Sequence, residues 1–540
     1  MEFFAPDNAH LYIAIVLSVI NGLMLCFASY KFFQMIQIVG YKIKGYYLWV
    51  RDTKAKYVSR LLMLGLLSAA CVLVTNALFW EYEPKGYYSY LGLVFYFYFT
   101  IVFIINIYSA PKKIPLKQTA RMTRLNIAMG IVMAGVSFGL MSVSMEWIPL
   151  LRYGVLCLTP ILIPLLVPLV HILMIPIEAA ITKKYLMSAK NKLKKRGDLI
   201  KIGITGSFGK TSTKYMLNTI LSQKYNVCMS PHSFNTTKGI SKVVNDFLKP
   251  ENEILITEMG ACNRGDIKAI ANFINPKYGI ITSVGTQHLY SFGSVENLKN
   301  TKYELIEALP SDGIAIFNGF NTGAMELYER CSIEKYAVGK DKDLTVGDIK
   351  VGKDGTQFMI KYNKKSMKCE TQLLGKHNIE NIMLCVRMAL LLGLETQQIK
   401  EGIAALKPVP HRLEVKNEGN VTILDDSYNA SVEGCVVALE VLSKFEGKKI
   451  VVTPGLVELG SLEKEENEKF GEKIAKVADS VIVVNKVNLE SIKQGLMNVG
   501  FNMEQVYDAE TLEKAKQLLS GIVVEGAVVL LENDLPDNYL

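Results

Sequence analysis

Five long apolar stretches before residue 180 limit the folds that this chain can adopt more than any other feature does. They cover residues 11–29, 61–80, 90–109, 125–143 and 154–176. A helix needs about 20 predominantly apolar residues to cross the hydrocarbon core of a bilayer, and each stretch is close to that length. Half of the chain's residues are hydrophobic, and the excess over an ordinary water-soluble protein lies in these stretches. The sequence therefore predicts a membrane domain of about five transmembrane helices over residues 1–180.

The distribution of basic residues predicts how these helices are oriented. Residues 30–60 and 110–124 are rich in lysine and arginine, whereas residues 81–85 and 145–147 together contain one lysine. Because positively charged loops stay on the cytosolic side, we expect a multi-pass protein of the plasma membrane. Its N-terminus would lie outside, and everything after the fifth stretch would lie in the cytoplasm. Residues 181–198 form a basic linker that we expect to lie along anionic headgroups of the bilayer.

A glycine-rich run at residues 205–212, Thr-Gly-Ser-Phe-Gly-Lys-Thr-Ser, predicts a binding loop for the phosphates of a nucleotide. It lies between an apolar run typical of a buried strand and an amphipathic helical stretch, the context that a phosphate loop requires. The glycines let backbone N–H groups approach phosphate oxygens, and the helix adds its positive dipole end. The alternative is a glycine-rich turn with an exposed lysine. The residues predicted to bind the nucleotide here are Gly206, Ser207, Gly209, Lys210, Thr211 and Ser212.

The chain after residue 198 has the pattern of an α/β protein. Short runs of valine and isoleucine alternate with amphipathic helical stretches, which is typical of parallel strands joined by helices. A Pro-Val-Pro break at residues 408–410 divides this part into two α/β domains, residues 199–408 and 409–540. We expect the first domain to bind the nucleotide and the second to close over it.

Two classes of function are disfavoured by composition. The nine cysteines are scattered and include no Cys-x-x-Cys pair, so the sequence indicates neither a zinc site nor a disulfide framework. The positive net charge of the chain comes mostly from residues near the membrane stretches, and no basic patch with interleaved aromatic residues follows them. We therefore expect no nucleic-acid binding.

Three further groups of residues narrow the range of reactions that this chain could catalyse. Glu258 ends a predicted strand, where a carboxylate beside a phosphate loop can hold Mg²⁺. His288 follows another predicted strand, and Lys302 lies downstream of it. Arg412 precedes a pair of aspartates that includes Asp426. Taken singly, each group has a structural explanation, as a hydrogen-bonded histidine, a solvated lysine or a turn.

These motifs follow Gly-Lys-Thr in the order just given. Together they resemble the motifs of the Mur ligase family, and in particular those of its D-alanyl-D-alanine-adding branch. The resemblance runs from about residue 200 to the C-terminus and excludes the first 180 residues. It implies a P-loop central domain and a Rossmann-like C-terminal domain. It also implies an ATP-dependent ligase of peptidoglycan-type cell-wall synthesis, which joins an amino acid or short peptide to a carboxylate of a cell-envelope precursor through an acyl phosphate.

The resemblance also implies roles for individual residues. The expected catalytic residues are Lys210, His288, Lys302 and Arg412. The expected magnesium ligands are Thr211, Glu258, His288 and Lys302; in the family this lysine is usually carbamylated and helps to hold a second Mg²⁺. Beyond the phosphate loop, the residues expected near ATP are Asn318, Asn378, Asn381, Arg412, Asp426 and Tyr428. Those expected near the substrates are Asn235, Thr236, Tyr428 and Asn429.

The sequence departs from the family in two places that concern the substrates. Membrane stretches stand where the soluble enzymes have the domain that holds a uridine nucleotide, so a lipid-linked acceptor is consistent with the chain. The family's Lys-Gly-Ser-Arg near the end is replaced by Glu-Asn-Asp-Leu-Pro-Asp at residues 532–537. This acidic segment either changes the charge preference of the amine site or is a solvated tail. Both explanations remain open from the sequence.

Two other functions are compatible with the sequence. One is a ligase that extends a polymer such as poly-γ-glutamate, and the other is an ATP-driven membrane transporter or flippase. The membrane stretches show no inverted repeat and few charges, which disfavours a transporter. Formation of an amide product distinguishes a ligase from a transporter, and a ladder of products identifies a polymer ligase.

Overall fold

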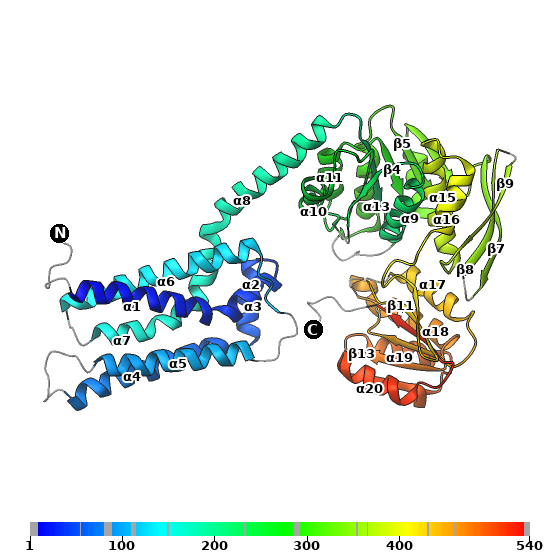
Figure 1. The fold of residues 1–540 in the computed structure, drawn as a ribbon. Coiled ribbons are helices and arrows are strands. Elements are labelled where there is room, and N and C mark those ends of the chain that lie inside the picture. Colours follow the sequence, from blue (N-terminus) through cyan, green and yellow to red (C-terminus); the bar gives the residue numbers. More distant parts are fainter. Residues whose placement is uncertain are drawn as a thin grey trace. The chain divides into compact units, whose positions relative to one another are not determined.

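A computed structural model shows how the chain is organised (Figure 1). It describes residues 9–53, 56–79, 89–109, 115–147, 151–231, 234–285, 292–352, 355–363, 365–428, 431–457 and 459–533. The chain forms two units, Met1–Lys183 and Lys184–Leu540. The division falls inside one long helix, α8 (Ile163–Lys195), so most of the predicted basic linker is helical.

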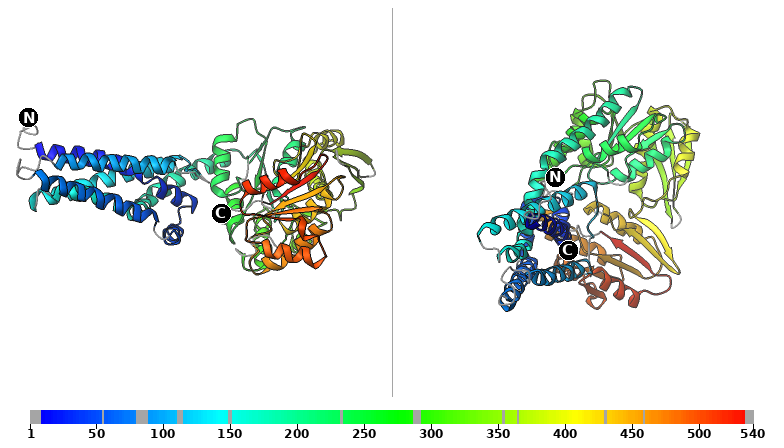
Figure 2. Two further views of the ribbon diagram at one scale, coloured as in Figure 1. Left: turned by 90° about the horizontal axis from the view of Figure 1, so that it is seen from below. Right: turned by 60° about the vertical axis from the view of Figure 1, so that its left-hand side comes forward.

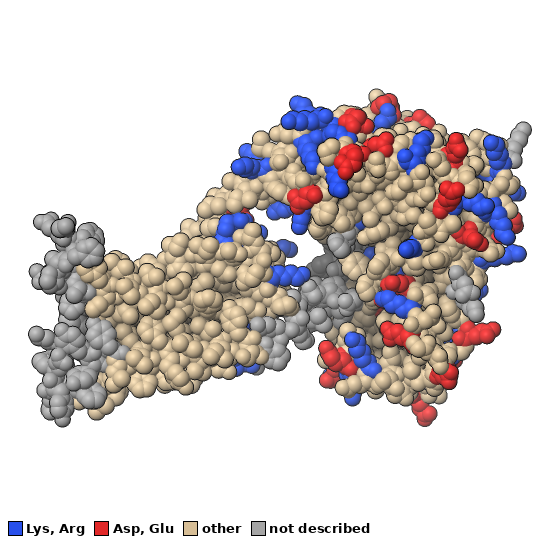
Figure 3. All heavy atoms as spheres, in the orientation of Figure 1, with Lys and Arg blue, Asp and Glu red and all other residues tan. Residues whose placement is uncertain are grey.

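The first unit consists of helices. They are α1 (Ala9–Ala28), α2 (Tyr30–Ile38), α3 (Ile43–Asp52), α4 (Lys56–Phe79), α5 (Ser89–Ser109), α6 (Ala120–Trp147), α7 (Leu151–Leu158), the short 3₁₀ turn η3 (Thr159–Leu162) and the start of α8. Five segments are long and apolar enough to cross a membrane: Leu11–Ala28, Lys56–Leu78, Leu91–Ser109, Ala120–Ser142 and Tyr153–Lys195. The face of this bundle visible in Figure 3 carries almost no charged side chain. The predicted apolar helices are therefore present.

A buried polar cluster joins the helices of the first unit. The Asn21 side-chain amide donates to the hydroxyls of Ser137 and Thr159, each at 2.9 Å, and accepts from the Tyr96 hydroxyl at 2.5 Å. All four residues are buried. Because an apolar environment offers no other partners to these groups, the cluster fixes how α1, α5 and α6 pack on one another.

One proline of α8, Pro168, is accommodated by a neighbouring helix. Proline has no N–H group, so Pro168 leaves the carbonyl of Pro164 without its helical partner. The hydroxyl of Tyr46, a fully buried residue of α3, donates to this carbonyl at 2.9 Å. An unsatisfied carbonyl in an apolar bundle is costly, and Tyr46 removes that cost.

The second unit contains a six-stranded parallel sheet in the order β2-β3-β1-β4-β5-β6. The strands are β1 (Ile200–Thr205), β2 (Val227–Met229), β3 (Ile254–Glu258), β4 (Tyr278–Ile281), β5 (Ile314–Asn318) and β6 (Glu334–Val338). One face packs on α9 (Lys210–Leu221), α15 (Lys376–Leu391) and α16 (Thr396–Ala404), and the other on α10 (Thr237–Lys242), α11 (Asp266–Ile274), α13 (Val295–Glu307) and α14 (Thr322–Arg330). Helices on both faces explain why the central strands are apolar along their whole length.

Two further sheets follow in the sequence (Figure 2). The strands β7 (Leu344–Gly352), β8 (Gly355–Tyr362) and β9 (Lys365–Thr371) form an antiparallel meander. The last sheet has the order β10-β11-β15-β12-β13-β14, and only the edge strand β10 is antiparallel in it. Its strands are β10 (Glu414–Glu418), β11 (Val421–Asp426), β12 (Lys449–Thr453), β13 (Ser480–Val484), β14 (Val506–Ala509) and β15 (Val528–Glu532). Its helices are α17 (Val432–Leu442), α18 (Glu463–Ala475), α19 (Leu489–Asn498) and α20 (Leu512–Ile522). The predicted fold class, apolar helices followed by α/β layers, is confirmed.

We expect Tyr46→Phe to destabilise the first unit. The substitution leaves the Pro164 carbonyl without its tertiary partner, and this should lower the free energy of unfolding by about 1 kcal/mol. All three tryptophans lie in this unit, so tryptophan fluorescence during a denaturant titration in detergent reports on it alone. Tyr47→Phe is the matched control, because Tyr47 is 47% exposed. Equal stability of the two variants would contradict the account.

Candidate active site

The predicted phosphate loop lies between β1 and α9, at the carboxyl end of the first sheet. Gly209 has φ of 79°, and a Cβ atom there would lie 2.9 Å from Oδ1 of Asn381, so the position requires glycine. The N–H groups of Ser207 and Phe208 donate to the carbonyl and the hydroxyl of Ser283, each at 2.9 Å. The segment after β4 therefore holds the loop in place at the start of α9.

Lys210, the first residue of α9, folds back over this loop. Its Nζ donates to the carbonyls of Gly206 at 2.6 Å and Ser207 at 2.9 Å. Burial lowers the pKa of Lys210, Glu258 opposes this shift and Arg412 adds to it, and the resulting pKa is about 8. An ammonium group at a helix N-terminus attracts an anion, as expected of a phosphate-binding lysine.

Glu258, at the end of β3, gathers several polar side chains around one buried carboxylate. It accepts hydrogen bonds from the Thr211 hydroxyl at 3.0 Å, from Nζ of Lys214 at 3.2 Å and from the Asn235 amide at 3.4 Å. Lys214 is fully buried, and burial lowers its pKa. The sequence interpretation missed this lysine, although its position four residues after Lys210 puts both on one face of α9.

Lys302 on α13 lies close to the loop and is buried, with 3% of its surface exposed. Burial, reinforced by the charge of Lys210, lowers the pKa of Lys302 to about 7. The nearby Glu304 has a structural role, because it accepts from the N–H groups of Gly265 at 2.7 Å and Lys268 at 2.9 Å. The carboxylate thereby stabilises the N-terminus of α11.

The asparagines predicted to lie near ATP take different positions. Asn318, at the end of β5, donates to Glu380 at 3.2 Å, and Glu380 lines the cavity although Asn318 does not. Asn378 and Asn381, both on α15, line the cavity. The Asn378 amide donates to the Leu374 carbonyl at 2.7 Å.

The turn before β10 contributes Arg412, whose guanidinium lies 4.8 Å from the ring centre of Tyr428. The residues on either side of it, His411 and Leu413, have φ of 60° and 50°, a costly conformation for residues with a side chain. Asp426 stabilises this turn by accepting the Leu413 N–H at 2.9 Å. Burial raises the pKa of Asp426, although the charge of Arg412 opposes the shift.

Asp425 has different neighbours from Asp426. It accepts from the His411 ring at 2.8 Å, from Nζ of Lys416 at 2.6 Å and from the Ser427 hydroxyl at 2.6 Å. His411, Glu414 and Asp425 lie close enough to hold a metal ion. Lys416, however, is 3.0 Å from Glu414 as well, so its ammonium group already neutralises this cluster.

The acidic segment near the C-terminus begins inside the last sheet. Glu532 is fully buried at the end of β15, and Asn533 donates its side-chain amide to the Gly455 carbonyl at 2.6 Å. These two residues therefore belong to the packed domain and are not part of a solvated tail. The other residues of the segment lie outside the described part of the chain.

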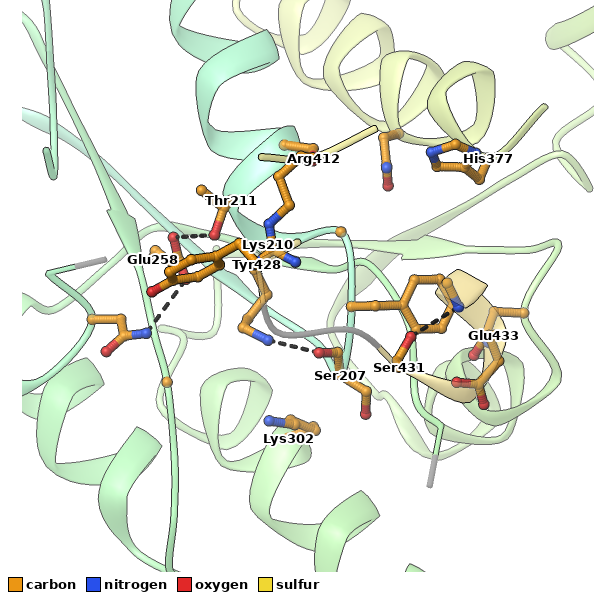
Figure 4. A pocket seen from close by; sticks show the side chains of 18 of the residues that line it. Ser207, Lys210, Thr211, Glu258, Lys302, His377, Arg412, Tyr428, Ser431 and Glu433 are labelled. Carbon is orange, nitrogen blue, oxygen red and sulfur yellow. Dashed lines mark hydrogen bonds between the residues drawn. The ribbon is translucent and has the colours of Figure 1, made fainter. Parts of the chain in front are cut away.

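One cavity of about 800 Å³ brings most of these side chains together. Figure 4 shows Lys210, Thr211, Glu258 and Arg412 converging on the same space. Of the predicted site residues, those lining the cavity are Ser207, Gly209, Lys210, Thr211, Ser212, Asn235, Thr236, Glu258, Lys302, Asn378, Asn381, Arg412, Asp426 and Tyr428. Two predicted residues, His288 and Asn429, lie outside the described residues. Glu433 also lines the cavity. The sequence interpretation missed this residue, because it belongs to none of the recognised motifs.

This arrangement of side chains is suited to phosphoryl transfer from a nucleoside triphosphate. A glycine loop at a helix N-terminus and two cationic side chains, Lys210 and Arg412, surround a space next to the oxygen atoms of Thr211 and Glu258. Fixed positive charge of this kind stabilises the negative charge that develops when a phosphoryl group is transferred. Hydroxyl and carboxylate oxygens are also the ligands that Mg²⁺ prefers.

Comparison with known proteins agrees with this geometry. Residues 204–389 match the Mur ligase middle domain, and residues 411–532 match the domain described as Mur ligase, glutamate ligase domain. The "UDP-N-acetylmuramoyl-tripeptide--D-alanyl-D-alanine ligase" of Bacillus subtilis is 32% identical over 287 residues, which are 52% of this chain and 62% of the relative. The Escherichia coli protein of the same name is 32% identical over 292 residues, or 53% of this chain and 64% of the relative. The chain thus spans less than two thirds of the length of these relatives.

Two solved structures share the fold of this part of the chain. The MurF ligase of Thermotoga maritima in complex with ADP has a TM-score of 0.58 and 28% identity, and the match covers 65% of this chain and 80% of that chain. The MurF of Acinetobacter baumannii has a TM-score of 0.59 and 23% identity, over 65% of this chain and 77% of that chain. The two matched domains together account for more than half of the chain. The chain therefore belongs to the Mur ligase family.

Proposed function

We propose that this protein is an ATP-dependent ligase that joins an amine to a carboxylate of a cell-envelope precursor. The observation that supports it most directly is that one cavity is lined both by the phosphate loop after β1 and by Arg412, which precedes β10. The relatives are named as ligases that act on a muramoyl tripeptide and D-alanyl-D-alanine. The matched domains and the relatives lend no support to the polymer-ligase or transporter alternatives.

ATP and Mg²⁺ are the expected cofactors. A MurF ligase of the same fold was solved with ADP, and the loop from Ser207 to Ser212 lines the cavity here. Thr211 and Glu258 offer oxygen ligands 3.0 Å apart, and His288 is the third proposed ligand. When bound, the metal supplies positive charge beside the reacting phosphate.

The reaction proceeds in two steps. An oxygen of the acceptor carboxylate attacks the γ-phosphorus of ATP, and the bond to the β-phosphate oxygen breaks to release ADP. Lys210 and Arg412 stabilise the negative charge that develops in this step. The amine, after losing a proton, then attacks the acyl carbon, the bond from carbon to the phosphate oxygen breaks, and inorganic phosphate leaves. Closure of the second α/β domain over the cavity would keep water away from the acyl phosphate.

Lys302 is proposed to carry a carbamate that helps to hold a second Mg²⁺. Only a neutral amine reacts with carbon dioxide, and the lowered pKa of about 7 makes a large fraction of this buried lysine neutral at physiological pH. The modification would convert a buried amine into an oxygen ligand of negative charge. It would also lower the positive charge that Lys302 adds beside Lys210.

The acceptor is proposed to be a peptidoglycan-type precursor in its lipid-linked form. Five helices are long and apolar enough to cross a membrane, and they stand where the resemblance leads us to expect a domain for a uridine nucleotide. Asn235 and Thr236 line the cavity on the side of the first sheet and are the proposed contacts of the acceptor. The proposed location is the plasma membrane, with the N-terminus outside and the catalytic domains in the cytoplasm.

Cys262 allows the proposed orientation to be tested. It is exposed, whereas the other eight cysteines are buried or half-buried. A membrane-impermeant maleimide should therefore label Cys262 in inverted membrane vesicles and leave it unlabelled in intact cells. Cys262→Ala is the control that assigns the label to this residue. Labelling in intact cells would contradict the proposed orientation.

The ligase activity is tested by product analysis on the full chain in detergent. With Mg-ATP, D-alanyl-D-alanine or other amines, and lipid-linked or UDP-linked tripeptide, we expect an amide product by mass spectrometry and one phosphate per amide. Lys210→Met should lower kcat by at least about 100-fold, because it removes a charge that stabilises the transition state. Lys249→Met, which removes an exposed lysine of the same domain, should leave kcat unchanged. Hydrolysis of ATP without any amide product would contradict the proposal.

The same activity assay also tests the role proposed for Lys302. Lys302→Ala should lose most activity and regain part of it when a short carboxylic acid is added, because the acid can replace the carbamate in the space left by the side chain. Lys249→Ala should show no response to the acid. A Lys302→Ala protein of full activity would contradict the role proposed for the carbamate.

A further inference from the structure

A buried ion pair lies next to the phosphate loop. Lys214, in the second turn of α9, is fully buried, and its Nζ lies 3.2 Å from Oε2 of Glu258, whose side chain is 2% exposed. Glu258 lines the cavity, whereas Lys214 does not. A ligand in the cavity therefore meets the carboxylate and makes no contact with the lysine.

Packing alone does not account for a lysine at this position of α9. Leu217 and Leu221, three and seven residues further on, lie on the same face of the helix and are buried in the core. Removing two charges from water is costly, and a buried ion pair is often no more stable than an apolar pair of similar volume. The charge of Lys214 is therefore the property that needs an explanation.

The two oxygen atoms of the Glu258 carboxylate have different partners. Oε2 accepts from Nζ of Lys214 and from the Thr211 hydroxyl, the latter at 3.0 Å (Figure 4). Oε1 accepts from the Asn235 amide at 3.4 Å, which is long for a hydrogen bond. Lys214 and Thr211 thus hold the carboxylate in an orientation that leaves Oε1 the more available oxygen for a ligand in the cavity.

Lys214 also cancels the charge that would attract a divalent cation to Glu258. The ion pair has no net charge, and Lys210 adds a positive charge among the residues that line the cavity. The other carboxylates on this side of the cavity have partners of their own. Asp266 accepts from two backbone N–H groups before α11, and Glu380 accepts from the Asn318 amide.

We infer that Lys214 is a positioning residue that makes the binding of Mg²⁺ depend on the nucleotide. It orients Glu258 and neutralises its charge, so a divalent cation gains little from this carboxylate until phosphate oxygens bind the same ion. The metal and the nucleotide therefore bind together. This inference rests on the proposed function, because that function supplies the nucleotide and assigns Glu258 to the metal.

The test measures binding of Mn²⁺, which prefers the same oxygen ligands as Mg²⁺ and whose paramagnetic resonance reports the free ion. The full chain in detergent is titrated with Mn²⁺ in the absence of nucleotide. Lys214→Met keeps the length of the side chain and removes its charge, so this variant should bind Mn²⁺ at least about tenfold more tightly than the unmodified protein. Lys249→Met, which removes an exposed lysine of the same domain, should bind it as weakly as the unmodified protein.

A double variant shows whether the additional affinity arises at Glu258. Lys214→Met with Glu258→Gln removes both charges of the pair and should lose the gain seen in Lys214→Met. It leaves no buried carboxylate without its partner, so it should fold, and the unfolding temperature of each variant verifies folding. Equal binding by Lys214→Met and the unmodified protein, or tight binding that persists in the double variant, would overturn the inference.

The unmodified protein provides a second measurement that depends on no substitution. A fluorescent ADP analogue should bind at least about tenfold more tightly with Mg²⁺ than with EDTA, because the metal and the phosphates stabilise each other's binding. Equal binding in the two solutions would overturn the inference and leave the nucleotide site in place. Failure of the analogue to bind in either solution would refute the proposed function together with the inference.

Discussion

The rest of this site depends on buried charge around the phosphate loop. Lys214 and Lys302 are buried, Lys210 is half-buried, and the Glu258 carboxylate lies beside Lys214. Burial lowers the pKa of each of these lysines, which means that the fold holds them at a cost in free energy. Phosphate groups of a nucleotide would relieve that cost. A sheet covered by helices on both faces provides the rigid frame that such a site requires.

On the opposite side of the cavity, Arg412 is accompanied by three carboxylates, Asp426, Glu433 and Glu440. Asp426 and Glu532 are brought together by the pairing of β11 with β15, and Glu433 is placed by the start of α17. The pKa of Asp426 and of Glu532 is raised by burial. The side of the phosphate loop also carries the carboxylates Glu258, Asp266 and Glu380 beside its lysines. Both sides of the cavity thus combine acidic and basic side chains.

The sequence predicts those features that depend on local spacing. Five apolar stretches and the run from Gly206 to Ser212 are recognisable because hydropathy, glycine positions and helix N-termini are properties of short segments. The apposition of Asp426 and Glu532 is different, since it depends on a strand order in which β15 inserts between β11 and β12. The contact between Tyr46 and Pro164 likewise joins residues more than 100 positions apart. Such pairs follow from topology, which a single sequence does not specify.

Asp425 and Asp426 show that position in the sequence alone does not determine the surroundings of a side chain. Asp425 and Asp426 are adjacent, yet one is neutralised by Lys416 and the other lines the cavity. Alternation along β11 sends their side chains to opposite faces of the sheet. The family resemblance selects Asp426, and the strand geometry gives the physical reason for the difference.

The proposed function depends on the activation of a carboxylate by phosphate transfer from ATP. The most direct measurement uses an acceptor tripeptide, in its lipid-linked and UDP-linked forms, with oxygen-18 in its carboxylates. Mass analysis of the released inorganic phosphate then reports whether an oxygen atom moved from the acceptor. We expect one labelled oxygen in the phosphate for each amide formed, because the carbon–oxygen bond of the acyl phosphate breaks in the second step. Release of unlabelled phosphate would contradict it and would indicate that water attacks ATP directly.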